Sequence, residues 1–342
     1  MSLFNNMKRL LLTFVALLCC VAFSVIFYVN SIWSQPTGSF SENFLVPKGK
    51  GFNWVASQLE DKEVIPNANV FKLFQRFQYA DIQVKAGEFD LSKSMTQAEL
   101  IEKFGKGDVV LYQVTLIDGW NYQQFKQHLI QQDGLVSKLS SMTDNEVLVA
   151  LNLKDKHPEG MFAPDTYFFQ KGDSDLDILR RSHQNQLEIL DIAWNNFESH
   201  TNYQELSQFI SSPYKALILA SIIEKETGQE SERETISGVF YNRLKIGMKL
   251  QTDPTVIYGM GDRYKGNIRR KDLTTDTPYN TYTRYGLPPT PIAMPGKASI
   301  LAALNPQETE SFYFVGKGDG SHYFSKNLKE HNRAVAKYQL GK

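Results

Sequence analysis

The chain has 342 residues, enough for two or three domains with a sizeable core. Lys and Arg total 37 and Asp and Glu total 37, so there is no charge excess to favour a nucleic acid or an acidic lipid surface. We therefore expect no nucleic-acid partner, and local motifs must indicate the function.

An apolar run over residues 10–29 follows a basic pair, Lys8 and Arg9. About twenty apolar residues suffice to span a bilayer. No Lys or Arg follows until Lys48, so the charge bias predicts that residues 1–9 stay in the cytoplasm and that the rest is exported. A cleaved signal peptide is the alternative, but the run is long for one and no convincing cleavage site follows it.

Both cysteines, Cys19 and Cys20, lie inside this run, so the exported part must fold without disulfides. A lipoprotein is disfavoured because Leu18 precedes Cys19 where a small residue is expected. The polar, turn-rich stretch that follows is typical of a linker and covers residues 30–42.

Short strands and helices are predicted over residues 43–107. The order is a strand, two helices, a second strand and a third helix that Thr96 caps and that Gly105 or Gly107 ends. These elements are expected near residues 43–46, 52–59, 70–77, 87–91 and 96–105. The order strand, two helices, strand is typical of a carbohydrate-binding module of the LysM type, and a generic α+β packing domain fits the pattern equally.

A second domain is predicted over residues 108–342. Its clearest strand covers residues 109–117, which are rich in β-branched side chains, and the Asp118-Gly119 turn leads into a helix. The chain is then mostly helical to about residue 210, apart from a break at residues 160–167.

The next helix has an unusually apolar sequence. Ser212 is a suitable N-cap, Pro213 suits the first helical position, and Gly228 is placed to close the last turn. Residues 216–223 are almost wholly apolar, so this helix belongs inside the domain. Glu224 follows where the helix leaves the core.

Apolar surroundings and the negative end of the helix dipole both disfavour an ionised carboxyl, so we expect Glu224 to hold a proton near neutral pH. Such a glutamate suits general acid catalysis. The alternative is a helix end at which Glu224, Lys225 and Glu226 are simply solvated. A helix that is apolar all round gives no facing that separates Glu224 from Glu226.

The elements that follow are expected to surround this helix. Residues 231–234 have the pattern of a capping box that opens a second helix, which predicts a helical hairpin with Glu224 near its mouth. Gly and Pro every few residues predict loops over residues 251–289, where binding residues tend to lie. A two-strand hairpin near residues 312–324 and a closing helix at residues 327–338 complete the domain.

Carboxylate acid and base catalysis is the chemistry that remains open. The six His form no H-E-x-x-H or comparable pair, and no P-loop, dinucleotide-binding or G-x-S-x-G motif occurs. Both cysteines lie in the apolar run, which excludes a catalytic thiol. We therefore expect neither a metal nor another cofactor.

The C-terminal part contains several distinctive sequence motifs, at residues 220–227, 231–233, 239–244, 250–259, 279–282 and 286–289. They closely resemble the YceG-like family of endolytic murein transglycosylases. The resemblance is dense over residues 213–335 and weaker over the rest of the chain, including the apolar run and the LysM-like module.

The resemblance implies a protein of the bacterial inner membrane whose periplasmic domain cuts peptidoglycan strands internally. It implies that Glu224 is catalytic, in preference to Glu226. Glu224 is the first glutamate of the Ile-Ile-Glu-Lys-Glu-Thr motif. Glu224 would protonate the oxygen of the β-1,4 bond between N-acetylmuramic acid and N-acetylglucosamine. It would then accept the proton of the muramic C6 hydroxyl, which closes a 1,6-anhydro ring without a second carboxylate.

Seven residues are candidates for lining the glycan groove: Asn242, Gln251, Thr252, Asp253, Tyr279, Asn280 and Tyr282. Each is equally suited to holding the loops in place. Two other functions stay open. One is a muramidase, in which a second carboxylate such as Asp253 faces Glu224, and the other is a non-catalytic peptidoglycan-binding adaptor.

The predicted architecture is α+β: a single N-terminal transmembrane helix, a LysM-like module, and a mixed α/β catalytic domain with its core at residues 213–335. Peptidoglycan strands are the expected ligand. The resemblance also implies contact with peptidoglycan synthases, because a cutter held near nascent strands would end their elongation.

Overall fold

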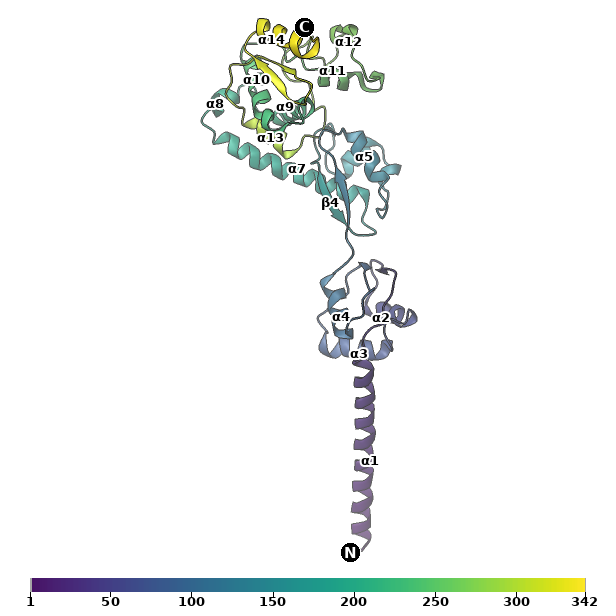
Figure 1. Cartoon of the computed structure of the whole chain (residues 1–342). Coiled ribbons are helices and arrows are strands. Elements are labelled where there is room, and N and C mark those ends of the chain that lie inside the picture. Colours follow the sequence, from purple (N-terminus) through teal and green to yellow (C-terminus); the bar gives the residue numbers. More distant parts are fainter. Residues whose placement is uncertain (1, 342) are drawn as a thin grey trace. The chain divides into compact units, whose positions relative to one another are not determined.

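The computed structural model describes residues 2–341 (Figure 1). The chain divides into two compact units, which we call the N-terminal unit (Met1–Tyr112 with Gln170–Gly172) and the C-terminal unit (Gln113–Phe169 with Asp173–Lys342). The fold is a mixture of helices and short, two-stranded sheets.

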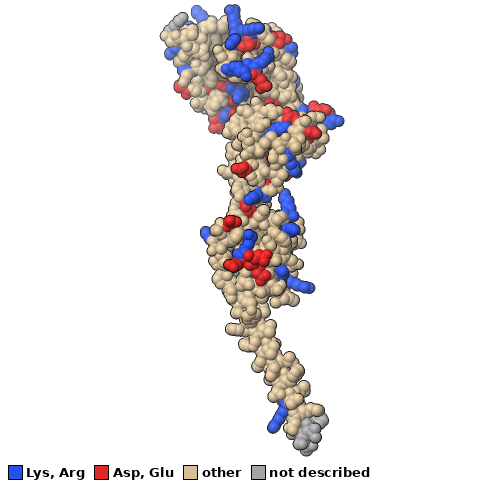
Figure 2. Space-filling view, turned by 90° about the vertical axis from the view of Figure 1, so that its right-hand side faces the viewer, with Lys and Arg blue, Asp and Glu red and all other residues tan. Residues whose placement is uncertain are grey.

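The N-terminal unit begins with the long apolar helix α1 (Ser2–Trp33). Its stretch Asn6–Trp33 is long and apolar enough to cross a membrane, and the most apolar window of that stretch is not buried against the rest of the protein. Figure 2 shows α1 as an almost uncharged surface with a basic side chain near its start. The span predicted at residues 10–29 lies inside this helix.

The segment predicted as a linker is held against the N-terminal unit. The side-chain amide of Gln97 donates to the carbonyl oxygens of Ile32, Trp33 and Gln35 at 2.8, 3.2 and 3.2 Å. Further along, the backbone N–H of Thr37 donates to Met95 at 2.8 Å. This segment is therefore part of the N-terminal unit, because its polar groups bond to other residues of that unit.

The predicted order of a strand, two helices and a strand is confirmed in the N-terminal unit. The elements are β1 (Phe44–Val46), α2 (Phe52–Asp61), α3 (Ala68–Gln78), β2 (Gly87–Phe89) and α4 (Gln97–Lys106). β1 and β2 pair antiparallel with Phe44 opposite Phe89, and both rings meet Phe104 of α4 edge-on at 5.9 and 4.6 Å. Trp33 at the end of α1 stacks on Phe74 of α3 at 4.1 Å.

The sequence did not predict one strand, β4, in the first half of the C-terminal unit. The elements of this half are β3 (Tyr112–Leu116), α5 (Tyr122–Ile130), η1 (Leu139–Ser141), α6 (Asp144–Ala150), β4 (Asp165–Phe169) and α7 (Asp175–Glu198). β3 and β4 form a two-stranded sheet. The Gly and Pro residues before β4 indicated only a break between helices. The partner strand, β3, lies far away in the sequence, so no local pattern predicted the pairing.

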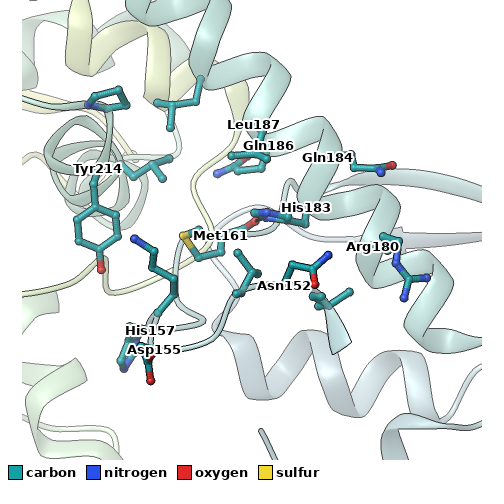
Figure 3. A pocket seen from close by; sticks show the side chains of 16 residues that line it. Asn152, Asp155, His157, Met161, Arg180, His183, Gln184, Gln186, Leu187 and Tyr214 are labelled. Atoms are coloured by element: carbon teal, nitrogen blue, oxygen red, sulfur yellow. Dashed lines mark hydrogen bonds between the residues drawn. The ribbon is translucent and has the colours of Figure 1, made fainter. Parts of the chain in front are cut away.

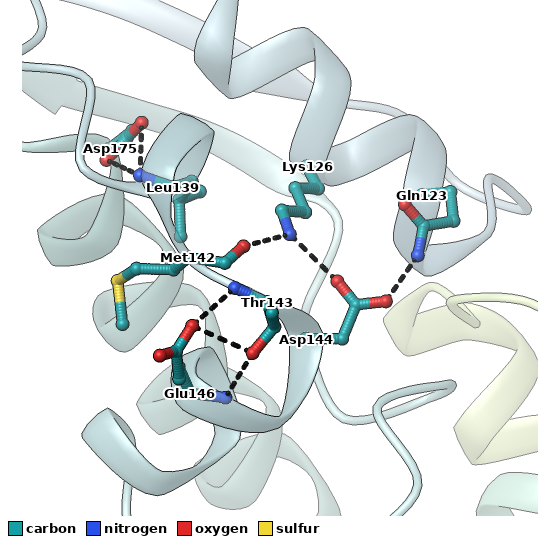
Figure 4. A network of polar contacts seen from close by, with 8 residues as sticks. All are labelled: Gln123, Lys126, Leu139, Met142, Thr143, Asp144, Glu146 and Asp175. Atoms are coloured by element: carbon teal, nitrogen blue, oxygen red, sulfur yellow. Dashed lines mark hydrogen bonds and ion pairs between the residues drawn. The ribbon is translucent and has the colours of Figure 1, made fainter.

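A polar network fixes α5 against the start of α6 (Figure 4). Lys126 Nζ donates to Met142 O and to Asp144 Oδ1, both at 2.8 Å, and Gln123 donates to Asp144 Oδ2 at 2.7 Å. Thr143 caps α6 through a capping box with Glu146. This network holds the N-terminal end of α5, which contacts the candidate site.

The second half contains α8 (Tyr203–Leu206), α9 (Pro213–Glu226), η2 (Glu230–Glu232), α10 (Arg233–Lys245), α11 (Asp253–Met260), η3 (Gly261–Arg263), α12 (Arg270–Thr274), α13 (Lys297–Leu304), β5 (Tyr313–Gly316), β6 (His322–Ser325) and α14 (Leu328–Gln339). The hairpin of β5 and β6 and the closing helix α14 confirm the prediction. The prediction of loops between α10 and α13 was incomplete, because α11 and α12 lie there.

The capping box predicted at residues 231–234 was wrong. α10 begins at Arg233, and no side chain caps it. The carboxylate of Glu232 instead accepts the backbone N–H of His322 at 2.9 Å and lies 2.7 Å from its Nδ1. A tertiary contact thus replaces the local one that the sequence pattern favours.

Helix α9 is the buried centre of the C-terminal unit, packed against α7, α10, α11 and α13. Ser212 caps it by accepting the N–H of Lys215 at 3.3 Å, as predicted. The helix ends at Glu226 with Thr227 extended, so Gly228 lies beyond it rather than closing its last turn.

Candidate active site

Glu224 lies in the last turn of α9, and its side chain is 7% exposed. Glu224 Oε2 accepts the backbone N–H of Gly296 at 3.0 Å, and Oε1 lies 3.8 Å from Arg233 Nη2. Gly296 is the N-cap of α13 and Arg233 begins α10, so three helix ends meet at this carboxyl. The N–H at the start of α13 and the guanidinium of Arg233 stabilise Glu224 when it is ionised. Neither Arg233 nor Gly296 was predicted from the sequence to lie beside Glu224.

A second carboxyl, Asp118, lies near Glu224. The turn that contains it is bonded to the segment before α13, since Gly119 N–H donates to Met294 O at 2.9 Å. A Cβ on Gly296 would lie 2.4 Å from Asp118 Oδ1, so this close approach requires glycine. Burial and the negative charge of Glu224 raise the pKa of Asp118, and Arg233 opposes them. From the sequence, Asp118 was part of a turn only.

A third acidic group, Glu159, is 3% exposed and was missed by the sequence analysis. Its two carboxylate oxygens accept the backbone N–H of Tyr122 and the hydroxyl of Tyr258, both at 3.0 Å. Burial raises the pKa of Glu159 to about 7, and the positive charge of Lys225 acts against that rise. The only local signal was the Gly and Pro break that begins just after this residue.

Glu226 faces a different part of the molecule from Glu224. Two residues along a helix correspond to a rotation of roughly 200°. Glu226 lines a cavity of about 430 Å³, together with four candidates: Gln251, Thr252, Asp253 and Tyr282. Thr252 donates to Glu226, and Tyr282 donates to Asp253 Oδ1 at 2.6 Å. Burial raises the pKa of Glu226 to about 7.

The other three candidates hold loops in place. Asn280 is buried, and its amide donates to the carbonyl oxygens of residues 272, 273 and 275 at 3.1, 3.2 and 2.7 Å. Asn242 donates to Thr309 O at 2.6 Å. The hydroxyl of Tyr279 lies 2.9 Å from Thr290 Oγ1, and its ring meets Tyr258 edge-on at 4.9 Å.

The site is suited to moving protons. Glu224 is shielded from solvent, and its carboxylate has a backbone donor and a cation beside it. Among residues 2–341, no three His, Cys, Asp or Glu side chains are grouped so that they could hold a metal ion.

These features define a mixed α/β protein with an apolar N-terminal helix and a site built on carboxyl groups. The chain belongs to the YceG-like family, which matches residues 44–337. The family predicted from the sequence motifs is therefore confirmed.

Relatives are found in several bacteria. The chain is 34% identical over 313 residues to the endolytic murein transglycosylase of Bacillus subtilis, covering 86% of this chain and 84% of that protein. It is 26% identical over 327 residues to the protein of the same name in Streptococcus pneumoniae strain D39, covering 86% of this chain and 57% of that protein. The crystal structure of a YceG-like protein from Listeria monocytogenes is similar at a TM-score of 0.53 and 33% identity, covering 86% of this chain and 99% of that one.

Proposed function

We propose that this chain is an endolytic murein transglycosylase, which cleaves the β-1,4 bond between N-acetylmuramic acid and N-acetylglucosamine inside peptidoglycan strands. The observation that carries the proposal is the placement of Glu224 at the junction of three helix ends, in a chain whose relatives bear that name. A shielded carboxyl with fixed donors suits proton transfer to a leaving oxygen.

The reaction needs one carboxyl and no water. Glu224 gives its proton to the glycosidic oxygen while the bond from that oxygen to C1 of the muramic residue breaks. The C6 hydroxyl oxygen of the same residue attacks C1, and its proton passes to Glu224, which restores the starting state. Between the two transfers Glu224 is ionised, and the N–H of Gly296 and the guanidinium of Arg233 stabilise that state.

The hydrolytic alternative requires a second carboxylate to activate water or to attack C1. The contacts favour Asp118 for that part over Asp253, because Asp118 interacts with Glu224 whereas Asp253 lies beside Glu226 and Tyr282. In the transglycosylase, Asp118 instead packs against Gly296 and so helps to position the backbone N–H that binds Glu224.

Glycan binding is assigned to both units. In the C-terminal unit, the cavity that Glu226 lines with Gln251, Thr252, Asp253 and Tyr282 supplies hydrogen-bonding groups and an aromatic ring for sugar. The other three candidates, Asn242, Tyr279 and Asn280, hold the surrounding loops through their own contacts.

In the N-terminal unit, the order of strand, two helices and strand supports a LysM-like glycan-binding module over residues 43–107. Helix α1 serves as a single-pass anchor in the bacterial inner membrane, with residues 1–9 in the cytoplasm and the catalytic domain, residues 108–342, in the periplasm. Anchoring near nascent strands also supports contact with peptidoglycan synthases.

The test incubates peptidoglycan with the full chain in detergent and identifies the fragments by mass spectrometry. Glu224→Gln is the test variant, and Glu188→Gln, which changes an exposed carboxyl on α7, is its control. Internal fragments with 1,6-anhydro ends from the wild type and the control, and none from Glu224→Gln, are expected. Reducing ends would mean hydrolysis, and no fragments from folded protein would favour the adaptor.

A further inference from the structure

The proposed function uses neither of two apolar surfaces. One is a cavity of about 800 Å³ between the turn at residues 151–161, α7 and α9, whose lining includes Met161 and Leu187 (Figure 3). Arg180 on its wall is paired with Asp177 at 2.8 Å, and the mixed lining indicates no particular ligand. The other surface is the outer face of α3 in the N-terminal unit, and its surroundings do indicate a partner.

Helix α3 exposes an apolar stripe. Phe77 is 76% exposed and Leu73 is 44% exposed, and the two side chains lie one turn apart on the same side of the helix. Side chains of this kind are usually buried, as Phe71 is on the inner side of α3. Phe74, three residues before Phe77, stacks on Trp33 at the end of α1 at 4.1 Å. The apolar surface is therefore continuous from the end of α1 to the outer side of α3.

The end of α1 sets the level of α3 relative to a membrane. Residues 10–29 form about 30 Å of helix, which matches the hydrocarbon thickness of a bilayer. For a helix along the bilayer normal, Trp33 lies roughly 6 Å further out, within a headgroup layer of roughly 5–8 Å. Because Phe74 stacks on Trp33 and α3 contacts α1, α3 lies at the level of the headgroups (Figure 1).

Basic side chains flank the stripe. Lys72 and Arg76 lie on α3, which has no Asp or Glu, and Arg76 is a helical neighbour of both Lys72 and Leu73. Neither cation has an ion-pair partner among residues 2–341. An apolar stripe with basic neighbours is typical of a helix that lies in the plane of a membrane interface, where its cations bind lipid phosphates.

We propose that the outer face of α3 docks on the lipid surface of the leaflet in which α1 ends. Leu73 and Phe77 enter the boundary between headgroups and acyl chains, and Lys72 and Arg76 bind the phosphates of anionic phospholipids. The inference rests on the membrane anchor in the proposed function, and it needs no cleavage of glycan. Docking would hold the N-terminal unit against the membrane surface at a second point besides α1.

The test measures the depth of α3 in a bilayer. The full chain, with Cys19→Ser and Cys20→Ser, is placed at one copy per nanodisc of phosphatidylglycerol and phosphatidylcholine. A fluorophore is attached through Gln78→Cys, at the exposed end of α3, and lipids with a nitroxide on the headgroup quench it. Docking predicts strong quenching of this fluorophore.

Two variants separate docking from mere proximity to α1. We expect Phe77→Ser to lower the quenching at least about twofold, because the stripe loses its most exposed ring. Arg76→Gln should lower it in the anionic discs and leave it unchanged in discs of phosphatidylcholine alone. The control is Leu45→Ser, which removes an exposed apolar side chain from β1 and should change neither value.

Equal quenching in the wild type and in Phe77→Ser, or an equal loss with Leu45→Ser, would overturn the proposal. Quenching that Phe77 affects only in discs with two copies would overturn it too, because the stripe would then bind a second copy of the chain. A chain that does not insert into discs would refute both the anchor and the docking.

The proposed function is tested separately, because the discs hold the Glu224→Gln form and contain no peptidoglycan. Quenching that depends on Phe77 supports the docking even if the wild type cuts no strand. Cleavage of strands by a chain whose quenching does not depend on Phe77 would remove the docking and leave the enzyme.

Discussion

Replacing Glu159 by Gln tests whether the buried carboxyl imposes a pH dependence on folding. Burial raises its pKa from 4.5 to about 7, so the folded state holds a proton that the unfolded state releases above pH 4.5. Stability is then highest below pH 4.5 and falls as the pH rises through 7. The shift corresponds to about 3 kcal/mol at 1.36 kcal/mol per unit of pKa.

Gln cannot ionise, so the variant should lose this part of the pH dependence. Its carbonyl oxygen can still accept the N–H of Tyr122, and its amide can donate to the hydroxyl of Tyr258, which reverses that bond. We expect the variant to gain up to about 3 kcal/mol over the wild type at pH 8 and to match it near pH 4.5.

The assay is urea unfolding of the full chain in detergent at both pH values, followed by the fluorescence of its four tryptophans, of which Trp120 and Trp194 lie in the C-terminal unit. Glu188→Gln, on the exposed side of α7, is the control and should change neither value. Glu226 is present in all three proteins, so its own titration cancels in the differences. A Glu159→Gln effect of equal size at both pH values, or a loss of stability at pH 8, would refute the reasoning.

Three further changes probe the site and the anchor. Gly296→Ala should slow strand cleavage by roughly tenfold to a hundredfold, because its Cβ would meet Asp118 Oδ1 at 2.4 Å. Its φ of −71° suits Ala, so the melting temperature should hold, and an unchanged rate would contradict this account. Asp118→Asn should keep 1,6-anhydro ends and slow cleavage by less than about tenfold, whereas complete loss of cleavage would favour hydrolysis. Gln97→Ala should speed amide hydrogen exchange at Gln35, Thr37 and Gly38, and unchanged protection there would show that the side chain does not hold that segment.

Elements with strong local signals could be predicted from the sequence. α9 has its cap, its proline and its apolar run within one stretch, so its place in the core followed from spacing alone. The order of elements in the N-terminal unit followed in the same way, since Thr96 and Gly107 mark both ends of α4.

The surroundings of Glu224 could not be predicted, because they come from distant parts of the chain. Asp118, Arg233 and Gly296 lie in three separate segments that meet only when α9, α10 and α13 pack. Sequence spacing also could not predict in which direction each glutamate of α9 points. In the structure Glu224 binds Gly296 and Glu226 binds Thr252.

The mistaken elements have a common physical cause. Ser231 and Glu234 fit a local cap, but Glu232 is bound to His322, and the helix starts later. Gly and Pro near α11 indicated loops, yet Pro254 is accepted in the first turn of a helix, where it removes no needed N–H.

The bonds from Gln97 to the end of α1, with the stack of Trp33 on Phe74, tie this helix to the rest of the N-terminal unit. The 32 residues of α1 make a lever about 48 Å long. A tilt of about 20° in a bilayer would displace its far end sideways by roughly 16 Å. Under the proposed anchoring, tilt follows bilayer thickness, so lipid composition would set the direction in which α1 presents the N-terminal unit.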